Sequence, residues 1–263
     1  MRRPCARSGP RVREWHEVLT AGAPDRITKG MTYDLLFDAP TPPAIPIDGE
    51  EVAFPVRRVF CVGRNYAAHA AEMGNQVDRE APFYFTKSAH ALCLSGETIP
   101  YPLGTEDCHY EMEFVVAIGE NAFRVSEDRA SDAVFGYACG IDLTRRDLQA
   151  AAKEKRRPWD LGKDFENSAL IAPIAKAETF GQPEQQRISL IHNGETVQEA
   201  SLSDMVWSVP ELVSHLSRFY HLQPGDLIYT GTPAGVGPIA PGSELTGRID
   251  GLHPVTVSFD EAE

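Results

Sequence analysis

Two glutamates placed two residues apart could bind a metal ion. In the segment 109–118 the even positions are apolar, whereas the odd positions begin with His109, Glu111 and Glu113. This alternation predicts a β-strand that puts both glutamates on one side, with Cα atoms about 7 Å apart. Neighbouring carboxylates repel each other unless a proton or a cation lies between them. The pair therefore indicates a cation site, and the alternative is a solvent-facing strand with two ordinary glutamates.

A third carboxylate lies in an otherwise apolar stretch. Asp142 is the only acidic or basic residue in GYACGIDLT, residues 136–144. A lone buried carboxylate is costly unless it is paired or bound to a metal, although Asp142 could instead cap a helix that begins near Thr144. Together with Glu111 and Glu113 it would form an open, all-oxygen site. Such a site suits Mg²⁺ or Mn²⁺, and also Ca²⁺, rather than Zn²⁺.

A histidine and a glutamate three residues apart could move a proton. His69 and Glu72 lie in the alanine-rich segment 65–73, which predicts a short helix capped by Asn65 and ended by Gly74. The two side chains would share one face of that helix. An imidazole polarised by a carboxylate can take a proton from water near neutral pH. The alternative is an exposed pair on a surface helix.

Cationic side chains and a glycine-rich turn could contact an anionic substrate. Arg64, Arg145 and Arg146 carry forked donors that match a carboxylate, with surface charges as the alternative. Lys163 lies among turn residues, where a solvated lysine is the usual outcome. The turn 231–237 could offer backbone N–H groups to an anion or be purely structural. It lacks the phosphate-loop pattern, which argues against nucleotide binding.

The elements that must position these groups are mostly short strands. The patterns predict strands at 59–63, 82–87, 109–119, 133–143, 188–193, 227–231 and 255–259. They predict helices at 65–73, 145–155 and 209–219, and a turn-rich connection at 96–105. Many short strands with a few short helices indicate a mixed α/β fold that is mainly β.

Composition limits the class of protein. The 263 residues are 42% hydrophobic and 24% charged, which is typical of a globular protein of one or two domains. With 25 Lys and Arg against 38 Asp and Glu, the net charge of −13 argues against nucleic-acid or anionic-membrane partners. No apolar run approaches the length of a membrane span. Anionic substrates then require a local concentration of cations.

The beginning of the chain differs from the rest. Residues 1–30 carry seven Lys and Arg against three Asp and Glu, and we expect them to form a flexible extension. The proline-rich residues 31–58 predict a small β or extended segment, and 59–263 a catalytic domain. Five cysteines without metal-ligand spacing make a disulfide framework or a zinc site improbable. We expect a reduced, cytoplasmic protein.

Several ordered motifs resemble one enzyme family. They are GRNYAAHAAEMG, HYEMEFVVAIG, GYACGIDLTRRDLQ, KDFENSAL and LQPGDLIYTGTPAGVGP. Together they resemble the fumarylacetoacetate hydrolase family over residues 52–257. The resemblance implies a mixed β-roll fold with a few short helices, a homodimer, and an oxygen-ligated Mg²⁺ or Mn²⁺. It also implies hydrolysis of a carbon–carbon bond in a 2,4-diketo acid, with fumarylpyruvate from gentisate breakdown as the expected substrate.

The resemblance also implies roles for individual residues. It places the metal ligands at Glu111, Glu113 and Asp142, and the water-activating pair at His69 and Glu72. The expected substrate contacts are Lys163, which would stabilise developing negative charge, and Arg64, Lys87, Arg145, Arg146 and Thr232. Ser88 departs from the family pattern, in which proline usually follows Lys87. Acylpyruvase, oxaloacetate decarboxylase and diketo-acid isomerase activities share this scaffold and stay open, as does a non-catalytic, metal-stabilised binding domain.

Overall fold

The computed structural model describes residues 36–38, 40–72, 74 and 79–263. The described helices and strands all lie in the unit Pro42–Glu263. The predicted flexible extension 1–30 lies outside the described residues. Among the described residues, no helix has the length and apolar character needed to cross a membrane.

The largest sheet contains the strands that carry the predicted site. Its strand order is β4-β3-β15-β8-β9-β11-β5, and β12 pairs with β9 beside this path. Parallel pairing occurs between β15 and β3 and between β11 and β5, whereas the other pairs are antiparallel. The strand bounds are β3 Arg58–Gly63, β4 Phe83–Lys87, β5 Leu92–Leu94, β8 Met112–Ile118, β9 Val134–Asp142, β11 Ala169–Ile171, β12 Ala175–Lys176 and β15 Asp226–Tyr229.

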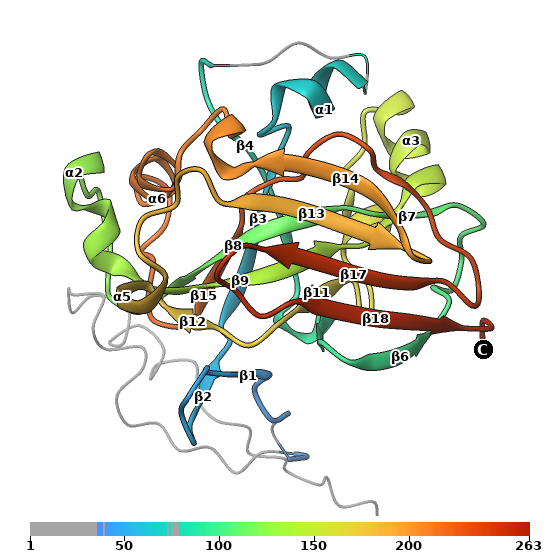
Figure 1. Cartoon of the computed structure of the whole chain (residues 1–263), viewed down its shortest axis with the longest axis horizontal. Coiled ribbons are helices and arrows are strands. Elements are labelled where there is room, and N and C mark those ends of the chain that lie inside the picture. Colours follow the sequence, from blue (N-terminus) through green and yellow to red (C-terminus); the bar gives the residue numbers. More distant parts are fainter. Residues whose placement is uncertain (1–35, 39, 73, 75–78) are drawn as a thin grey trace, which may run out of the picture. The chain divides into compact units, whose positions relative to one another are not determined.

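A second sheet of five strands packs against the first, as Figure 1 shows. Its order is β14-β13-β17-β18-β6, and only β18 and β6 are parallel. Phe60 and Phe114 of the large sheet share one apolar core with Leu190, Leu245 and Phe259 of the second. The strands are β6 Glu97–Pro100, β13 Arg187–His192, β14 Glu195–Ser201, β17 Glu244–Ile249 and β18 Val255–Asp260. The fold is thus mixed α/β and mainly β, as predicted.

Strand β8 is buried on both of its faces. Its even positions, such as Phe114, enter the core between the sheets, whereas Val115 and Ala117 enter a second apolar cluster with Ile45 and Phe54. The solvent-facing alternative for this strand is therefore excluded. Ile45 and Phe54 belong to the hairpin β1 Ala44–Pro46 and β2 Ala53–Pro55, which covers that face of the large sheet.

The strand predicted at 109–119 is interrupted at Glu111. Before this residue, β7 (Cys108–Tyr110) belongs to a three-stranded sheet with β10 (Thr144–Arg145) and β16 (Gly237–Pro238). After it, β8 joins the large sheet. The break lets the chain change sheets at Glu111, whose carbonyl oxygen accepts a hydrogen bond of 2.8 Å from the backbone N–H of Asp142.

Short helices surround the sheets. The α-helices are α1 Ala67–Glu72, α2 Glu127–Ala130, α3 Arg146–Glu154, α4 Asp160–Lys163, α5 Ala177–Phe180 and α6 Val209–Leu216. Among the described residues, single 3₁₀ turns lie at Ala89–Ala91, Ser131–Ala133 and Leu202–Asp204. Each helix and strand predicted from the sequence has a counterpart. Strands β5, β6, β10, β11, β12, β14, β16 and β17 were not predicted, and β6 lies inside the expected turn-rich connection.

Candidate active site

Three carboxylates meet where β8 and β9 run side by side. Met112 pairs with Ile141 and Glu113 with Gly140, so Glu111 and Asp142 are brought together at the same end of the two strands. One carboxylate oxygen from each of Glu111, Glu113 and Asp142 lies within 4.8 Å of the other two. Their residues are 6%, 1% and 0% exposed. The acids predicted to form one site are therefore together and almost completely buried.

Lys163 lies among these acids rather than in solvent. Its Nζ atom donates to Oε2 of Glu111 at 2.8 Å, to Oδ2 of Asp142 at 2.6 Å and to Oγ1 of Thr144 at 2.6 Å. The residue is 2% exposed and belongs to α4, a single turn that follows the loop after α3. The solvated-loop alternative is excluded. Its three ammonium protons are already directed at oxygens, so Lys163 compensates the charge of the acidic cluster.

A second cation binds the same cluster from the side of α3. Nη2 of Arg146 donates to Oε1 of Glu111 at 2.6 Å, and Nη1 donates to Oε1 of Gln149 at 2.7 Å. Although burial alone would raise the pKa of Glu111, the charges of Lys163 and Arg146 hold it well below its usual range. Glu111 is therefore an anion in the folded protein.

Glu113 has the opposite electrostatic environment. Burial, followed by the charges of Asp142 and Glu111, raises the pKa of Glu113 well above its ordinary value. Its Oε2 atom accepts a hydrogen bond of 2.7 Å from the backbone N–H of Gly231, which is too little to offset two neighbouring anions. A cation among the three acids would let Glu113 ionise.

The donor set fits a hard divalent cation. All three predicted ligands offer carboxylate oxygens, which Mg²⁺, Mn²⁺ and Ca²⁺ prefer, and none offers sulfur. The raised pKa of Glu113 supports this fit, because a cation among the three acids would counter the charges of Asp142 and Glu111, which after burial raise that pKa. Glu111, Glu113 and Asp142 are thus the groups that would hold the metal.

The predicted histidine–glutamate pair is formed on α1. Nδ1 of His69 lies 3.3 Å from Oε2 of Glu72, and His69 is buried against the pocket. The backbone N–H of Gly235 donates to both Glu72 oxygens at 3.1 and 3.2 Å. Glu72 is therefore held from two sides and orients the imidazole, so the pair is not simply a surface feature.

The expected helix cap at Asn65 is wrong. The Asn65 side chain crosses to other segments, donating to the carbonyl oxygens of Trp207 at 3.0 Å and Thr230 at 2.8 Å. Its Oδ1 atom accepts from the backbone N–H of Trp207 at 2.7 Å. These three bonds fix the start of α1 against Trp207 and against Thr230, which leads into the glycine-rich turn, and tertiary contacts replace the local cap.

The glycine-rich turn 231–237 holds two carboxylates in position and also lines the pocket. Two of its backbone N–H groups, those of Gly231 and Gly235, donate to Glu113 and Glu72. Thr232 lines the pocket, and its Oγ1 atom accepts 2.9 Å from Nε2 of Gln198. The N–H groups that were candidates for anion binding are therefore partly used to orient the protein's own carboxylates.

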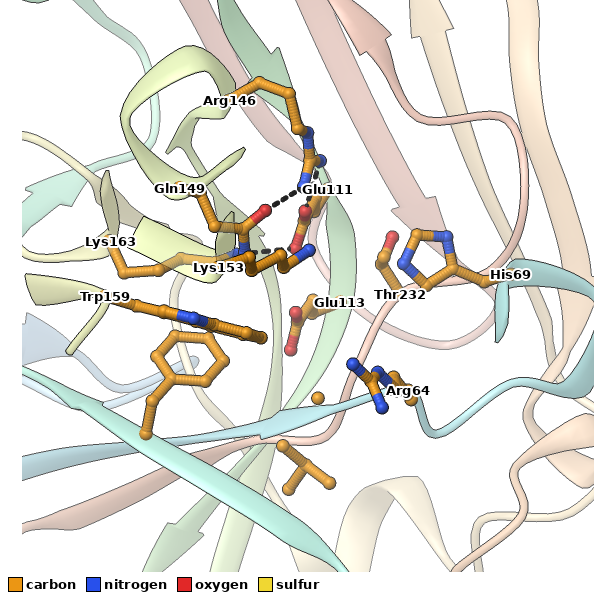
Figure 2. Close-up of a pocket in the computed structure, with 13 residues that line it drawn as sticks. Arg64, His69, Glu111, Glu113, Arg146, Gln149, Lys153, Trp159, Lys163 and Thr232 are labelled. Atoms are coloured by element: carbon orange, nitrogen blue, oxygen red, sulfur yellow. Dashed lines mark hydrogen bonds and ion pairs between the residues drawn. The ribbon is translucent and has the colours of Figure 1, made fainter. Parts of the chain in front are cut away.

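One pocket joins these groups, as Figure 2 shows. From the predicted set, the pocket is lined by Arg64, His69, Glu111, Glu113, Arg146, Lys163 and Thr232. Asp142 lies just beneath them, bonded to Lys163. Glu72 stands behind His69.

Lys87 lies behind the acidic cluster rather than in the pocket lining. Its Nζ atom lies 2.8 Å from Oδ1 of Asp142 and donates to the carbonyl oxygens of Leu143, at 3.2 Å, and Lys163. The structure therefore corrects its assignment as a substrate contact. Strand β4 directs this side chain into the protein interior, where it positions Asp142.

Arg145 also points away from the pocket. Its guanidinium lies 4.2 Å from the centroid of the Phe165 ring, and Nη1 donates 3.2 Å to the carbonyl oxygen of Leu161. Arg145 ends β10 and Arg146 begins α3, so the change of backbone conformation between them sends the side chains in different directions. This corrects the substrate-binding assignment of Arg145, whereas Arg146 lines the pocket.

Sequence reasoning missed Gln149, Lys153, Trp159 and Phe85, which also line the pocket. For two of them the signal was present. Arg146, Gln149 and Lys153 are spaced i, i+3, i+7 along α3, which places them on one helix face. Trp159 and Phe85 come from segments whose approach depends on the tertiary fold.

The family model for the fumarylacetoacetate (FAA) hydrolase C-terminal domain matches residues 58–259. This range includes both sheets and every pocket residue. The chain belongs to the fumarylacetoacetate hydrolase family. Its three-carboxylate cluster is thus the candidate metal site of a family enzyme.

Known relatives are similar over most of their length. A fumarylpyruvate hydrolase from Ralstonia sp. is 48% identical over 193 residues, which are 73% of this chain and 100% of the relative. The oxaloacetate tautomerase of Escherichia coli is 39% identical, with coverage of 79% and 94%. The crystal structure of Pseudomonas aeruginosa fumarylpyruvate hydrolase, in complex with Mn²⁺ and pyruvate, has a TM-score of 0.84 and 46% identity, covering 87% of this chain and 100% of that one.

Proposed function

We propose that this protein is a metal-dependent hydrolase that cleaves fumarylpyruvate into fumarate and pyruvate. One observation carries the proposal: a single pocket is lined by His69, which Glu72 orients, and by Glu111 and Glu113, which with Asp142 beneath them form a carboxylate cluster suited to a divalent cation. The similarity to fumarylpyruvate hydrolases, one of which was crystallised with Mn²⁺ and pyruvate, supports the choice of substrate.

The pyruvyl end of the substrate binds at the acidic cluster. When bound there, a divalent cation supplies Lewis-acid polarisation of the keto-acid oxygens and stabilises the negative charge of the departing enolate. Arg146 and Lys163 keep Glu111 ionised, and Lys87 and Lys163 form ion pairs with Asp142. Glu111 can therefore act as a ligand without losing a proton, whereas Glu113 ionises as the cation binds.

The hydrolytic step uses His69 as the general base. Glu72 orients its imidazole, which takes a proton from a water molecule that attacks the carbonyl carbon farther from the pyruvyl carboxylate. The carbon–oxygen bond forms, and collapse of the tetrahedral species breaks the carbon–carbon bond. Fumarate leaves with the new oxygen, and the enolate of pyruvate takes up the proton at its terminal carbon. Lys163 lines the pocket beside the cluster, and its fixed positive charge stabilises the developing negative charge.

A tautomerase acting on oxaloacetate is the second candidate, and the relatives that carry this activity favour it. Proton transfer by His69 at a keto acid held in the same cluster would suffice for that reaction. Acylpyruvase and oxaloacetate decarboxylase activities would use the same groups. A non-catalytic, metal-stabilised domain would leave the His69–Glu72 pair without a role.

We further propose that the enzyme uses Mg²⁺ or Mn²⁺ and works in the cytoplasm as a homodimer, in aromatic-ring breakdown through gentisate. The free, buried thiols of Cys61, Cys93, Cys108 and Cys139 support a reducing compartment. The all-oxygen donor set supports either metal. The homodimer rests on family resemblance alone, and sedimentation of the purified protein would test it.

Pyruvate release tests the substrate. The purified protein with Mn²⁺ is given fumarylpyruvate, acetylpyruvate or oxaloacetate, and pyruvate is measured over time. We expect the highest kcat/KM with fumarylpyruvate. Faster conversion of oxaloacetate, followed through its enol absorbance and through pyruvate formation, would replace the hydrolase by a tautomerase or a decarboxylase. Preference for acetylpyruvate would indicate an acylpyruvase.

A further inference from the structure

Two cations in the pocket have no carboxylate partner among the described residues. Four cationic side chains line it, and two of them, Arg146 and Lys163, form ion pairs with Glu111. Within the part of the chain that the structure describes, neither Arg64 nor Lys153 forms an ion pair or donates a hydrogen bond to an acid. The whole protein has a net charge of −13, so two unpaired cations facing one pocket are an unusual local concentration of positive charge.

Lys153 is half-buried on the pocket face of α3. Its Nζ atom lies 4.9 Å from the centroid of the Trp159 ring, so its side chain rests on an apolar surface rather than in solvent. Burial, followed by the charges of Arg146 and Arg64, lowers the pKa of Lys153 to about 8. A cation destabilised in this way gains from an anion that enters the pocket.

Arg64 reaches the same pocket from the segment between β3 and α1, as Figure 2 shows. Its backbone has a φ of 62°, in the left-handed region that residues other than glycine rarely adopt. The neighbouring Asn65 side chain holds this turn in place through its bonds to Trp207 and Thr230. A strained conformation maintained by tertiary contacts at a pocket is a reason to assign a function to the side chain it presents.

The remaining lining of the pocket is partly aromatic. Trp159 and Phe85 have ring centroids 6.2 Å apart, and both line the pocket. These rings offer an apolar contact to a planar, unsaturated carbon chain. The pocket therefore combines an acidic cluster, aromatic surface and a pair of free cations.

We propose that Arg64 and Lys153 bind a second carboxylate, at the end of the substrate farther from the keto-acid group. This subsite rests on the proposed function, because that function places the keto-acid group at Glu111, Glu113 and Asp142. It selects dicarboxylic over monocarboxylic 2-oxo acids. A monocarboxylic substrate would leave both cations unpaired, whereas the far carboxylate of a dicarboxylic one accepts charge-assisted hydrogen bonds from them.

Binding of two unreactive ligands tests the subsite separately from catalysis. 2-Oxoheptanedioate and 2-oxoheptanoate have the main-chain length of fumarylpyruvate and differ only in the far carboxylate. Their Kd values are measured by calorimetry on the Mn²⁺-loaded protein. We expect the wild-type protein to bind the dicarboxylate at least about tenfold more tightly.

Variants assign that preference to the two cations. In Lys153→Met and in Arg64→Gln the preference should fall by about tenfold, while the affinity for 2-oxoheptanoate stays within about twofold. Lys153→Arg should retain most of the preference for the dicarboxylate. Lys155→Met is the matched control, because Lys155 is exposed beyond the end of the same helix and does not line the pocket.

Two results would overturn the subsite. One is equal affinity of the wild-type protein for both ligands, and the other is a loss in Lys153→Met that affects both ligands alike, as a structural defect would. Neither result depends on turnover. Failure to hydrolyse fumarylpyruvate would contradict the proposed reaction while leaving the ligand preference measurable.

Discussion

The Nζ atom of Lys163 lies 2.6 Å from the Oδ2 atom of Asp142, and both side chains are almost completely shielded from solvent. The same ammonium group donates to Glu111, so one lysine compensates two of the three acids in the cluster. Burial alone would lower the pKa of Lys163, but the charges of Asp142 and Glu111 raise it well above its usual value. The acidic cluster is therefore held together by a fixed internal cation.

Removal of this cation should destabilise the metal-free protein. In Lys163→Met the acids keep their burial but lose a partner, and the loss of one member of a buried ion pair costs about 3–5 kcal/mol. Because Mn²⁺ can supply the missing positive charge, it should raise the Tm of this variant by more than it raises that of the wild-type protein. Thermal unfolding with and without Mn²⁺ measures both effects. An equal Mn²⁺-induced rise would argue that the metal does not bind these acids.

His69 should be required for turnover but not for binding of the metal. His69→Gln removes the base but leaves Glu111, Glu113 and Asp142 untouched, so kcat should fall by about 10²–10⁴-fold with Mn²⁺ affinity unchanged. Glu72→Gln should have a smaller effect, since the imidazole remains while its orientation weakens. Turnover and Mn²⁺ titration of the same preparations test this. A parallel loss of metal affinity would contradict the separation of roles.

The preference for a dicarboxylate should depend on pH through Lys153. Its pKa is lowered from 10.5 to about 8, by burial first and then by the charges of Arg146, Arg64 and Lys163, which Glu111 partly offsets. The ammonium form, which binds the anion, is present below pH 8 and is lost as the pH rises through this value. The ratio of the two 2-oxo acid affinities should therefore fall severalfold between about pH 7 and 9.5.

Lys153→Arg is the control for this titration, because arginine stays charged over the whole range. Its affinity ratio should not change with pH. Other titrating groups affect both ligands alike and cancel in the ratio. A ratio that is independent of pH in the wild-type protein would show that Lys153 does not contact the far carboxylate.

The residues that could be predicted from the sequence are those whose position follows from local periodicity. Strand alternation places Glu111 and Glu113 on one side, and the cost of burying a lone charge identifies Asp142. That the three meet depends on the β8–β9 register, which the sequence pattern does not specify. The helical spacing of His69 and Glu72 likewise gave a pair that the structure contains.

The remaining site depends on contacts between distant segments. Adjacent arginines separate because a strand ends at Arg145 and a helix begins at Arg146. The side chain of Lys87 faces inward because Lys87 pairs with Val59, so it shares the buried face of the large sheet with that residue. Asn65 bonds to Trp207 and Thr230, residues that are far away in the sequence. Lys153 was overlooked although its spacing from Arg146 indicated a shared helix face.

The most direct test of the account is the metal dependence of pyruvate release from fumarylpyruvate. The rate is measured with Mn²⁺, after chelation, and after Mn²⁺ is restored, for the wild-type protein, for Glu113→Gln and for the control Glu120→Gln, whose carboxylate is exposed. We predict that chelation abolishes release, that restored Mn²⁺ recovers it in the wild-type protein and in the control, and that Glu113→Gln stays inactive at Mn²⁺ concentrations that saturate the wild-type protein. Undiminished release after complete chelation, or wild-type activity in Glu113→Gln, would contradict the account.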